Sequence, residues 1–475
     1  MSTLKERLSR LHKAVEPTAA PSGSDPQQRE WERIGARIQK NDWGQFVIRV
    51  RRYPYDHVHG AYRLGDLCGG AEALAPLAAV GGKSGGGKGR RDHAGSRKTK
   101  EIGSDRTGRK ETVPVRHDRL LFLDTETTGL GVGAGNVPFM VGIGYYETDA
   151  FVVEQLFIRN PAEEAAMLAH LGERLAMRDI LVSYNGKCFD WPILKNRYIL
   201  NRRREFADDP LHFDFLYPSR SLWRNTLPSC RLSSVERERL GLSRVDDVPG
   251  SLAPALYFQY LAEGDPAIIA GVFDHNETDV LTLACLAVHF SRLLKGNVPF
   301  DQLEAEELYR LALWFDKLGM SRLADDAFAR LLERDPKETE NYLLHAADYY
   351  KKQGRYAEAV PLWERAVALK RDAKIAAVEP FVELAIYYEH RMKDYELALR
   401  YAEMALEKAW GLMSASRFDG KRSALCEALR HRIERLQRKR DGFFGSLGGT
   451  VTGGTKRGAR RDANGTIGAW QSTLL

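Results

Sequence analysis

Four acidic residues and one histidine have the types and spacing that metal-dependent chemistry needs. Asp124 and Glu126 end the apolar run LLFLDTET, and because side chains alternate along a strand, both carboxylates point to the same face. Charged groups at the end of a buried strand are costly unless something neutralises them, and a divalent cation does so directly. Two solvated acids are the ordinary interpretation of a lone Asp-x-Glu, but the longer run DTETTGL is more specific.

Two further segments carry acids that can reach the same point. In SYNGKCFDWP, Asp190 opens a predicted helix just after the short buried run ILVSY, although capping a helix is the usual role of such an aspartate. In FDHNETDVLTLACLAVHF, His275 and Asp279 are four residues apart on a predicted helix, so they share one face. Asn276 is a competing cap for that helix, in which case His275 would only pack at its rim.

Together these residues predict a site for two divalent ions. Phosphodiester hydrolysis develops charge on an attacking and a leaving oxygen, and two metal ions ~3.5–4 Å apart can stabilise both. Carboxylates are hard ligands that suit Mg²⁺ or Mn²⁺. The predicted metal ligands are Asp124, Glu126, Asp190 and Asp279. The predicted catalytic set adds His275, as a general base or as the group that orients the attacking water.

Nucleic acid is the partner expected for such a site. The candidate substrate-binding residues near the first two motifs are Thr127, Asn185, Lys187, Phe189 and Trp191. Further side chains could grip phosphates or stack on bases, as in proteins that bind single strands. These are Lys195, Arg197, Arg220, Arg231 and Tyr217. Any one of them is more often a surface or core residue.

The elements that must position these residues follow a mixed α/β order. Residues 119–157 give an apolar strand, a Gly-rich turn and two strand patterns with hairpin spacing. A helical stretch, the run ILVSY, a second helical stretch and the strand HFDFL follow. This order predicts a mixed five-stranded sheet flanked by helices, as in ribonuclease H-like folds. We expect this domain at residues 118–297, preceded by an N-terminal extension with short strands at residues 1–78.

From about Glu304 the sequence becomes helical and repeats itself. The repeated positions are Gly319, Ala324 and Phe328, then Gly354, Ala359 and Trp363, then Lys393, Ala398 and Ala402. An offset near 34 residues is typical of tetratricopeptide repeats, whose grooves usually bind proteins. We therefore predict an all-α repeat domain at residues 301–441 that recruits a protein partner. An unrelated helical bundle with chance periodicity is the alternative.

The net charge of +7 is concentrated outside the predicted domains. Residues 83–116 carry 11 Lys and Arg against four Asp and Glu, a composition that predicts a disordered linker at residues 79–117, dispensable for folding. The Gly-rich tail 442–475 is also expected to be disordered. Such basic arms hold phosphates in some proteins and are only solvated linkers in others.

Other features of the sequence limit which class of protein this is. No apolar run approaches the ~20 residues of a membrane span, and the N-terminus lacks the apolar segment of a signal peptide. The five cysteines are scattered without a Cys-x-x-Cys pair, so neither a disulfide framework nor a zinc site is indicated. A cytoplasmic protein without membrane contact is expected.

The acidic motifs resemble those of the DEDD superfamily of 3′–5′ exonucleases. Asp124 and Glu126 match its first motif, Asn185, Phe189 and Asp190 its second, and Asp279 its last acid. More narrowly, the chain resembles the bacterial YprB-like family, an exonuclease-type domain followed by tetratricopeptide repeats. The blocks that carry this resemblance are DTETTGL, YNGKCFDWPILKNR, LHFDFLYPSRSLW, PSCRLSSVE, DDVPG and HNETDVLTL, within residues 31–75 and 118–410.

The resemblance implies a metal-dependent 3′–5′ exonuclease that acts on single-stranded DNA or RNA ends. One departure concerns the proton acceptor. Superfamily members carry, before the last acid, a His with four residues between or a Tyr with three; His275 stands at the tyrosine-type spacing. The alternative function is a catalytically weak or inactive nucleic-acid-binding scaffold that mainly binds a partner. The presence of all four acids favours the enzyme.

Overall fold

The computed structural model describes residues 26–81, 114–129, 135–203, 208–245, 247–369, 377–414 and 420–447. The chain divides into two compact units, Met1–Asp335 and Pro336–Leu475. Most of the predicted linker 79–117 and of the predicted tail 442–475 lies outside the described residues.

The first unit is built on a seven-stranded mixed sheet with the order β1-β2-β7-β6-β5-β8-β9. β5 pairs antiparallel with β6 but parallel with β8, and β8 pairs parallel with β9. The strands are β1 (Ala36–Asn41), β2 (Gly44–Pro54), β5 (Leu120–Thr127), β6 (Pro138–Tyr146), β7 (Ala150–Phe157), β8 (Ile180–Ser183) and β9 (Leu211–Asp214). A separate short pair is formed by β3 (Val58–His59) and β4 (Tyr62–Arg63).

The sheet has two strands more than the five predicted. The additional strands are β1 and β2, which come from the N-terminal extension rather than from residues 118–297. β2 pairs with β7 over eight residues, from Val47 opposite Phe157 to Pro54 opposite Ala150. Phe46, Val47 and Ile48 are buried there, so the extension completes the sheet and its core.

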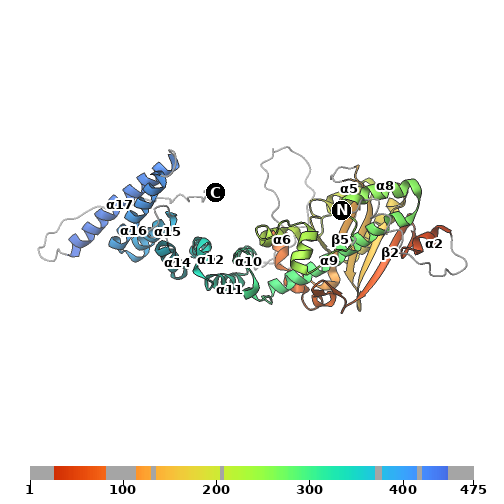
Figure 1. Ribbon diagram of the computed structural model, residues 1–475, viewed down its shortest axis with the longest axis horizontal. Coiled ribbons are helices and arrows are strands. Elements are labelled where there is room, and N and C mark those ends of the chain that lie inside the picture. Colours follow the sequence, from red (N-terminus) through yellow and green to blue (C-terminus); the bar gives the residue numbers. More distant parts are fainter. Residues whose placement is uncertain are drawn as a thin grey trace, which may run out of the picture. The chain divides into compact units, whose positions relative to one another are not determined.

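Helices cover the sheet, and α9 has the largest role in the site. α9 (Ala270–Leu294) contacts β5, β6 and β7 and lies across the sheet (Figure 1). Its apolar run from Val280 to Val288 is buried. Gly296, at φ +70°, ends it in the left-handed conformation that glycine tolerates best. The other helices of this part are α2 (Pro26–Glu32), α3 (Pro76–Gly81), α4 (Glu164–Met177), α5 (Asp190–Leu200), α6 (Leu216–Trp223), α7 (Leu232–Val235) and α8 (Ala253–Glu263).

The C-terminal region consists of paired helices. α10 (Ala305–Lys317) and α11 (Ser321–Leu332) belong to the first unit, because α10 packs on α6 and the Trp223 indole donates to Glu307 at 2.8 Å. The unit boundary therefore falls inside the predicted repeat region 301–441. The second unit contains α12 (Pro336–Thr339), α13 (Leu343–Lys352), α14 (Tyr356–Leu369), α15 (Glu379–Tyr387), α16 (Tyr395–Ser414) and α17 (Gly420–Leu447).

The turns between paired helices repeat the same backbone geometry. Gly319 follows α10 at φ +75°, Gly354 follows α13 at φ +73°, and Lys393 precedes α16 at φ +58°. After each glycine the next N–H bonds back to the carbonyl five residues earlier, as in a Schellman ending: Met320 to Phe315 and Arg355 to Tyr350. The 35-residue sequence offset therefore corresponds to a repeated helix–turn–helix. Assignment to the tetratricopeptide class stays a prediction.

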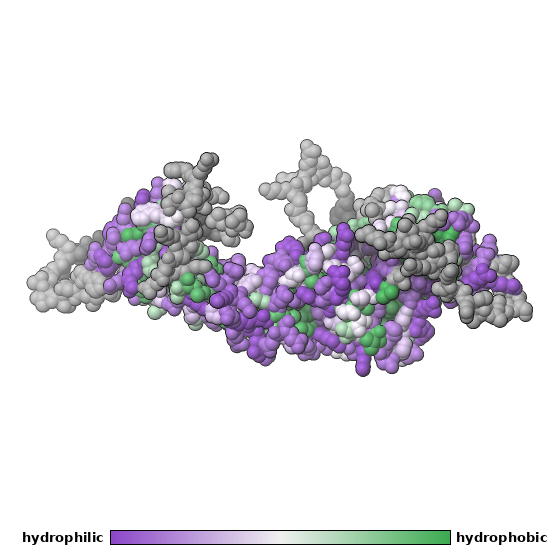
Figure 2. Space-filling model, viewed as in Figure 1, coloured by the Kyte–Doolittle hydropathy of each residue, from purple (hydrophilic) through white to green (hydrophobic). Residues whose placement is uncertain are grey.

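The visible face of the molecule is mostly hydrophilic, with small and separate hydrophobic patches (Figure 2). None of the described helices combines the length and the apolar character that a membrane crossing requires.

Candidate metal centre

The site lies where β5 meets α9. In the sheet Asp124 is opposite Gly142 of β6, and a Cβ atom on Gly142 would lie only 2.1 Å from Oδ1 of Asn276. Glycine at this position lets α9 approach the sheet closely. The Asn276 amide then donates to Oδ2 of Asp124 at 2.8 Å, so it holds an acidic side chain rather than capping a helix.

Three predicted site residues form a tight cluster. Ligand atoms of Glu126, His275 and Asp279 all lie within 4.8 Å of one another. Glu126 comes from β5, while His275 and Asp279 come from consecutive turns of α9, as their spacing predicted. Glu126 is only 9% exposed, so the cluster is withdrawn from bulk water.

The other two predicted ligands flank this cluster. Asp124 is held by Asn276, and Asp190, at the start of α5, accepts a hydrogen bond from the Thr125 hydroxyl. Thr125 lies between the two acids of β5 and points to the opposite face of the strand. The carboxylate of Asp190 nevertheless raises the pKa values of Asp124 and Glu126. All four acids therefore interact electrostatically, although not all of them belong to the three-residue cluster.

Three residues that sequence reasoning did not assign surround His275. Asp247 accepts from the His275 ring at Nδ1, at 2.8 Å. The Arg244 guanidinium bonds Glu236 at 2.6 and 2.7 Å and also pairs with Asp247 and Asp279. Glu236 ends the block PSCRLSSVE and Asp247 belongs to DDVPG. The block DDVPG therefore supplies the carboxylate that holds the histidine ring, and PSCRLSSVE supplies the acid that holds Arg244.

The pKa values indicate that the carboxylates of the site repel one another. Burial raises the pKa of Asp124 well above its usual range, and nearby carboxylates, Asp279 first, raise it further. Burial raises the pKa of Glu126 to about 8 and that of Asp190 to about 6. Burial lowers the pKa of His275, but the hydrogen bond to Asp247 and the charges of Asp279 and Asp247 outweigh it, so the net shift is upward.

This donor set fits hard divalent cations. Buried carboxylates that repel one another are stabilised when a cation replaces the protons, and carboxylate oxygens are the ligands that Mg²⁺ and Mn²⁺ prefer. Glu126 and Asp279 would hold an ion directly, with Asp124 and Asp190 as the adjacent ligands. Arg244, which pairs with Asp279, supplies part of the positive charge in the metal-free protein.

Metal binding is expected to depend on pH. Because the pKa of Glu126 is raised in the folded protein to about 8, ionising it destabilises the metal-free fold, and its contribution to stability is lost as the pH rises through that value. A bound cation reverses this penalty. We therefore expect Mn²⁺ to raise the melting temperature more at pH 8.5 than at pH 6, measured by calorimetry. Equal shifts at both pH values would contradict a carboxylate site.

A buried polar chain connects the N-terminal extension to this centre. Arg49 of β2, 2% exposed, donates from Nε to Gln155 at 2.7 Å. Gln155 donates to Oδ1 of Asn276 at 2.9 Å, and Asn276 donates to Asp124. The guanidinium of Arg49 also pairs with Glu277 at 2.6 Å. The extension therefore supports the orientation of a predicted metal ligand.

Truncating Arg49 tests this connection. Arg49→Ala removes a buried cation and leaves the partly buried Glu277 with the Tyr53 hydroxyl but without its ion-pair partner, which is expected to lower the free energy of unfolding by ~3–5 kcal/mol. Arg52→Ala on the same strand is the control, because its pairs with Glu147 and Asp149 are exposed and worth ~0–1 kcal/mol. Urea unfolding of both variants measures the difference, and similar losses would rule out the special role of Arg49.

The predicted substrate-binding residues divide into accessible and buried ones. Asn185 is exposed at φ +68°, in a turn whose Asn185 and Lys187 N–H groups donate to Asp214. Lys187 and Phe189 are partly exposed in the same segment. Thr127 is buried and donates to the Gly129 carbonyl.

Three other predicted contacts are already engaged within the protein. Trp191 is 5% exposed and its indole donates to Asp209, so its ring is a core group and the prediction of base stacking on it does not hold in this structure. Lys195 also pairs with Asp209, and Arg197 pairs with Glu164.

The comparisons with known proteins agree with this geometry. A family model described as the RNase H superfamily matches residues 121–291, the segment that contains every predicted ligand. The fold and this match thus define a ribonuclease H-like domain with a nuclease-like fold.

This chain is 35% identical over 421 residues to the uncharacterized protein YprB of Bacillus subtilis (strain 168). The aligned region covers 86% of this chain and 90% of that protein. This chain belongs to the YprB family.

Proposed function

We propose that the protein is a metal-dependent nuclease that hydrolyses phosphodiester bonds of single-stranded DNA or RNA from the 3′ end. The observation that carries this proposal is the cluster of Glu126, His275 and Asp279. Asp124 and Asp190 lie near it: after burial, Asp279 and Glu126 raise the pKa of Asp124, and Asp190 adds to the raised pKa of Glu126. A purely structural role would not require so many mutually repelling acids at one point. The match to the RNase H superfamily and the resemblance to DEDD exonucleases support the same activity.

The side chains have distinct roles in this proposal. Asp124, Glu126, Asp190 and Asp279 would hold two Mg²⁺ or Mn²⁺ ions, which when bound would supply stabilisation of charge on the attacking and leaving oxygens. Asp247 accepts the Nδ1 proton of His275, which leaves Nε2 as an acceptor near Asp279, 3.5 Å away. His275 can therefore orient a water molecule and accept its proton.

The substrate and partner follow from the chain's other features. Asn185, Lys187 and Phe189 lie at the start of the segment leading to Asp190, where they would contact the strand next to the scissile bond. The paired helices of the second unit are proposed to bind a protein partner, as repeated helix pairs commonly do.

The proposal is tested with purified protein and end-labelled DNA and RNA, single-stranded and duplex. With Mg²⁺ or Mn²⁺ we expect stepwise shortening of a 5′-labelled single strand from its 3′ end, and none with EDTA. Internal cuts would instead indicate that the protein is an endonuclease. Absence of cleavage on all four substrates with either ion would refute the activity.

One observation favours a second function, a weak or inactive nucleic-acid-binding scaffold. Arg244 pairs with Asp279 and so competes with a cation for one of the proposed ligands. If this pair persists in the presence of metal, the protein would bind nucleic acid without hydrolysing it. Binding of the labelled strands without cleavage is the result that would select this function.

A further inference from the structure

Two adjacent cavities border the ribonuclease H-like domain next to its second acidic motif. One, of about 550 Å³, is lined by residues of β9, α6 and α10; the other, of about 560 Å³, is lined by residues of the 184–185 and 227–232 segments. Both are lined by Arg220 and Arg224. The two cavities therefore form one surface, here called the α6 groove.

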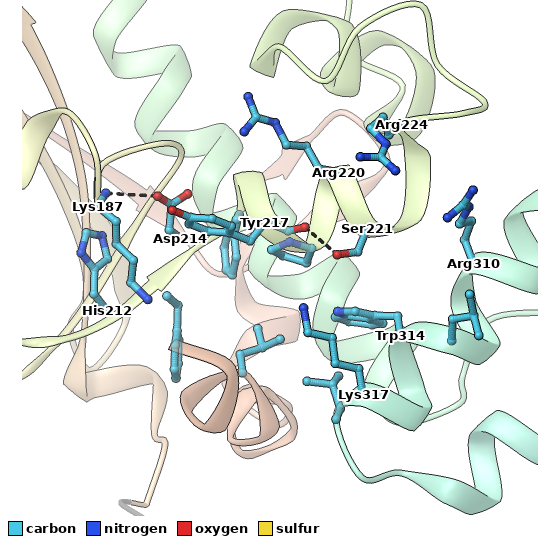
Figure 3. Close-up of a pocket in the computed structure, with 16 residues that line it drawn as sticks. Lys187, His212, Asp214, Tyr217, Arg220, Ser221, Arg224, Arg310, Trp314 and Lys317 are labelled. Carbon is cyan, nitrogen blue, oxygen red and sulfur yellow. Dashed lines mark hydrogen bonds between the residues drawn. The ribbon is translucent and has the colours of Figure 1, made fainter. Parts of the chain in front are cut away.

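Several basic side chains line the α6 groove beside apolar ones. Figure 3 shows Arg220 and Arg224 at α6, with Arg310 of α10 to one side of the cavity, Lys317 beside Trp314, and Lys187 on the opposite side. Arg231 lines the second cavity. Arg310 is paired with Glu306. Among the residues that the structure describes, Lys187, Arg220, Arg224, Arg231 and Lys317 make no ion pair.

This lack of partners distinguishes the groove from nearby basic residues. Lys195 and Arg197 of α5 are both paired with acids, whereas the groove concentrates five unpaired cations along two cavities. Asp214 is the one acid among the described residues that line the two cavities. The resulting excess of positive charge favours a polyanion, because each phosphate contact releases condensed counter-ions. Arg220 and Arg224 are four residues apart at α6, so they present their charges on one helix face.

The groove also leads toward the metal centre. Asn185 lines one cavity and Lys187 the other, and both belong to the turn that precedes Asp190. Asp214, at the end of β9, accepts hydrogen bonds from the backbone of both residues and fixes that turn. Tyr217, 46% exposed, also lines the groove and has an accessible aromatic ring.

We propose that the α6 groove binds the sugar-phosphate backbone of a single nucleic-acid strand, on the 5′ side of the end that enters the metal centre. This inference rests on the proposed nuclease function. Arg220, Arg224 and Lys317 contact phosphates, and Tyr217 stacks on a base, the combination by which single strands are bound without sequence preference. An acidic peptide would use the same charges but would not need the aromatic ring or the continuity with the metal centre.

Binding without cleavage is the appropriate measurement. Full-length protein carrying Asp124→Asn is titrated with a fluorescent 20-nucleotide poly(dT) strand in Mg²⁺, and anisotropy is followed at several salt concentrations. Adding Arg220→Ala and Arg224→Ala is expected to weaken binding at least tenfold at low salt. The slope of log K against log[salt] should fall in magnitude by about 1.4, because each phosphate contact to a single strand contributes ~0.7.

Two further variants sharpen the test. Arg33→Ala with Arg37→Ala removes the same charge, with the same spacing, near β1 at the opposite edge of the sheet, and is expected to change affinity less than twofold. Tyr217→Ala should weaken binding about 5- to 150-fold, the range of a lost base stack, with little change in the salt slope. Circular dichroism checks that each variant is folded.

The outcomes separate this inference from the nuclease proposal. If the Arg220 and Arg224 variant binds the strand as tightly as its parent, or no more weakly than the control, the groove is not the strand site, whatever the wild-type protein cleaves. Unchanged affinity in Tyr217→Ala together with equal competition by poly-glutamate would assign the groove to an acidic protein and overturn the proposal. If the wild-type protein neither binds nor cleaves the strand, the proposed nuclease function itself is wrong.

Discussion

Replacing Glu126 by glutamine is expected to reduce cleavage of a single strand by ~10³-fold. Glu126 belongs to the three-residue cluster on β5 and α9, and the amide removes one charged ligand without changing size. Metal ions contribute several kcal/mol of charge stabilisation in such reactions, and each 1.36 kcal/mol corresponds to a tenfold change in rate. Initial rates with Mg²⁺ and with Mn²⁺ measure the loss.

A matched control uses another glutamate near the same sheet. Glu147→Gln, after β6, removes an exposed partner of Arg52 and should leave the rate within twofold, because such surface pairs contribute little. Excess Mn²⁺ should restore part of the activity of Glu126→Gln if the defect is metal affinity. Full activity in Glu126→Gln would exclude the cluster as the catalytic centre.

Replacing His275 by alanine is expected to lower the turnover rate by ~10²–10⁴-fold, the usual contribution of a positioned acid–base group, while metal binding persists. Asp247→Asn should have a smaller effect in the same direction, because Asp247 orients the ring through Nδ1 without contacting the substrate. His275→Tyr restores the residue more familiar at this spacing and should retain part of the activity.

The pH profile distinguishes catalysis from packing. If His275 accepts a proton, Asp247→Asn should shift the acidic limb of the rate profile to lower pH, because the loss of the hydrogen-bonded carboxylate lowers the pKa of the imidazole. A purely structural role would change the unfolding midpoint but not the position of that limb. Near-wild-type turnover in His275→Ala would assign proton removal to another group.

The sequence predicted the central strands because each carries a continuous apolar run with a clear boundary. The β5 acids and the four-residue spacing of His275 and Asp279 likewise determined which side chains share a face. The two edge strands β1 and β2 had strand-like patterns, but their pairing with β7 depends on a contact about 100 residues away along the chain. Local patterns do not encode such pairings, so the predicted sheet had two strands fewer than the observed one.

The surroundings of His275 show a similar limit. Arg244 and Asp247 lie on irregular segments and Glu236 on the short helical turn Glu236–Leu240, and their side chains meet α9 only through the tertiary fold. The sequence could not predict the burial of Trp191 either, because an aromatic residue beside an acid is common both in a core and on a binding surface. The glycines at positions 319 and 354 were more informative, since a left-handed turn favours a residue without a Cβ, although Lys393 adopts the same conformation in the third turn.

Anomalous diffraction from Mn²⁺-soaked crystals tests the central claim most directly. Crystals of the full chain would be soaked at pH 8 with Mn²⁺ and a phosphorothioate single strand that resists hydrolysis. The account predicts two manganese peaks ~3.5–4 Å apart, in contact with Glu126 and Asp279 and bordered by Asp124 and Asp190. A bound strand with no manganese at these carboxylates, and with Arg244 still paired to Asp279, would contradict it.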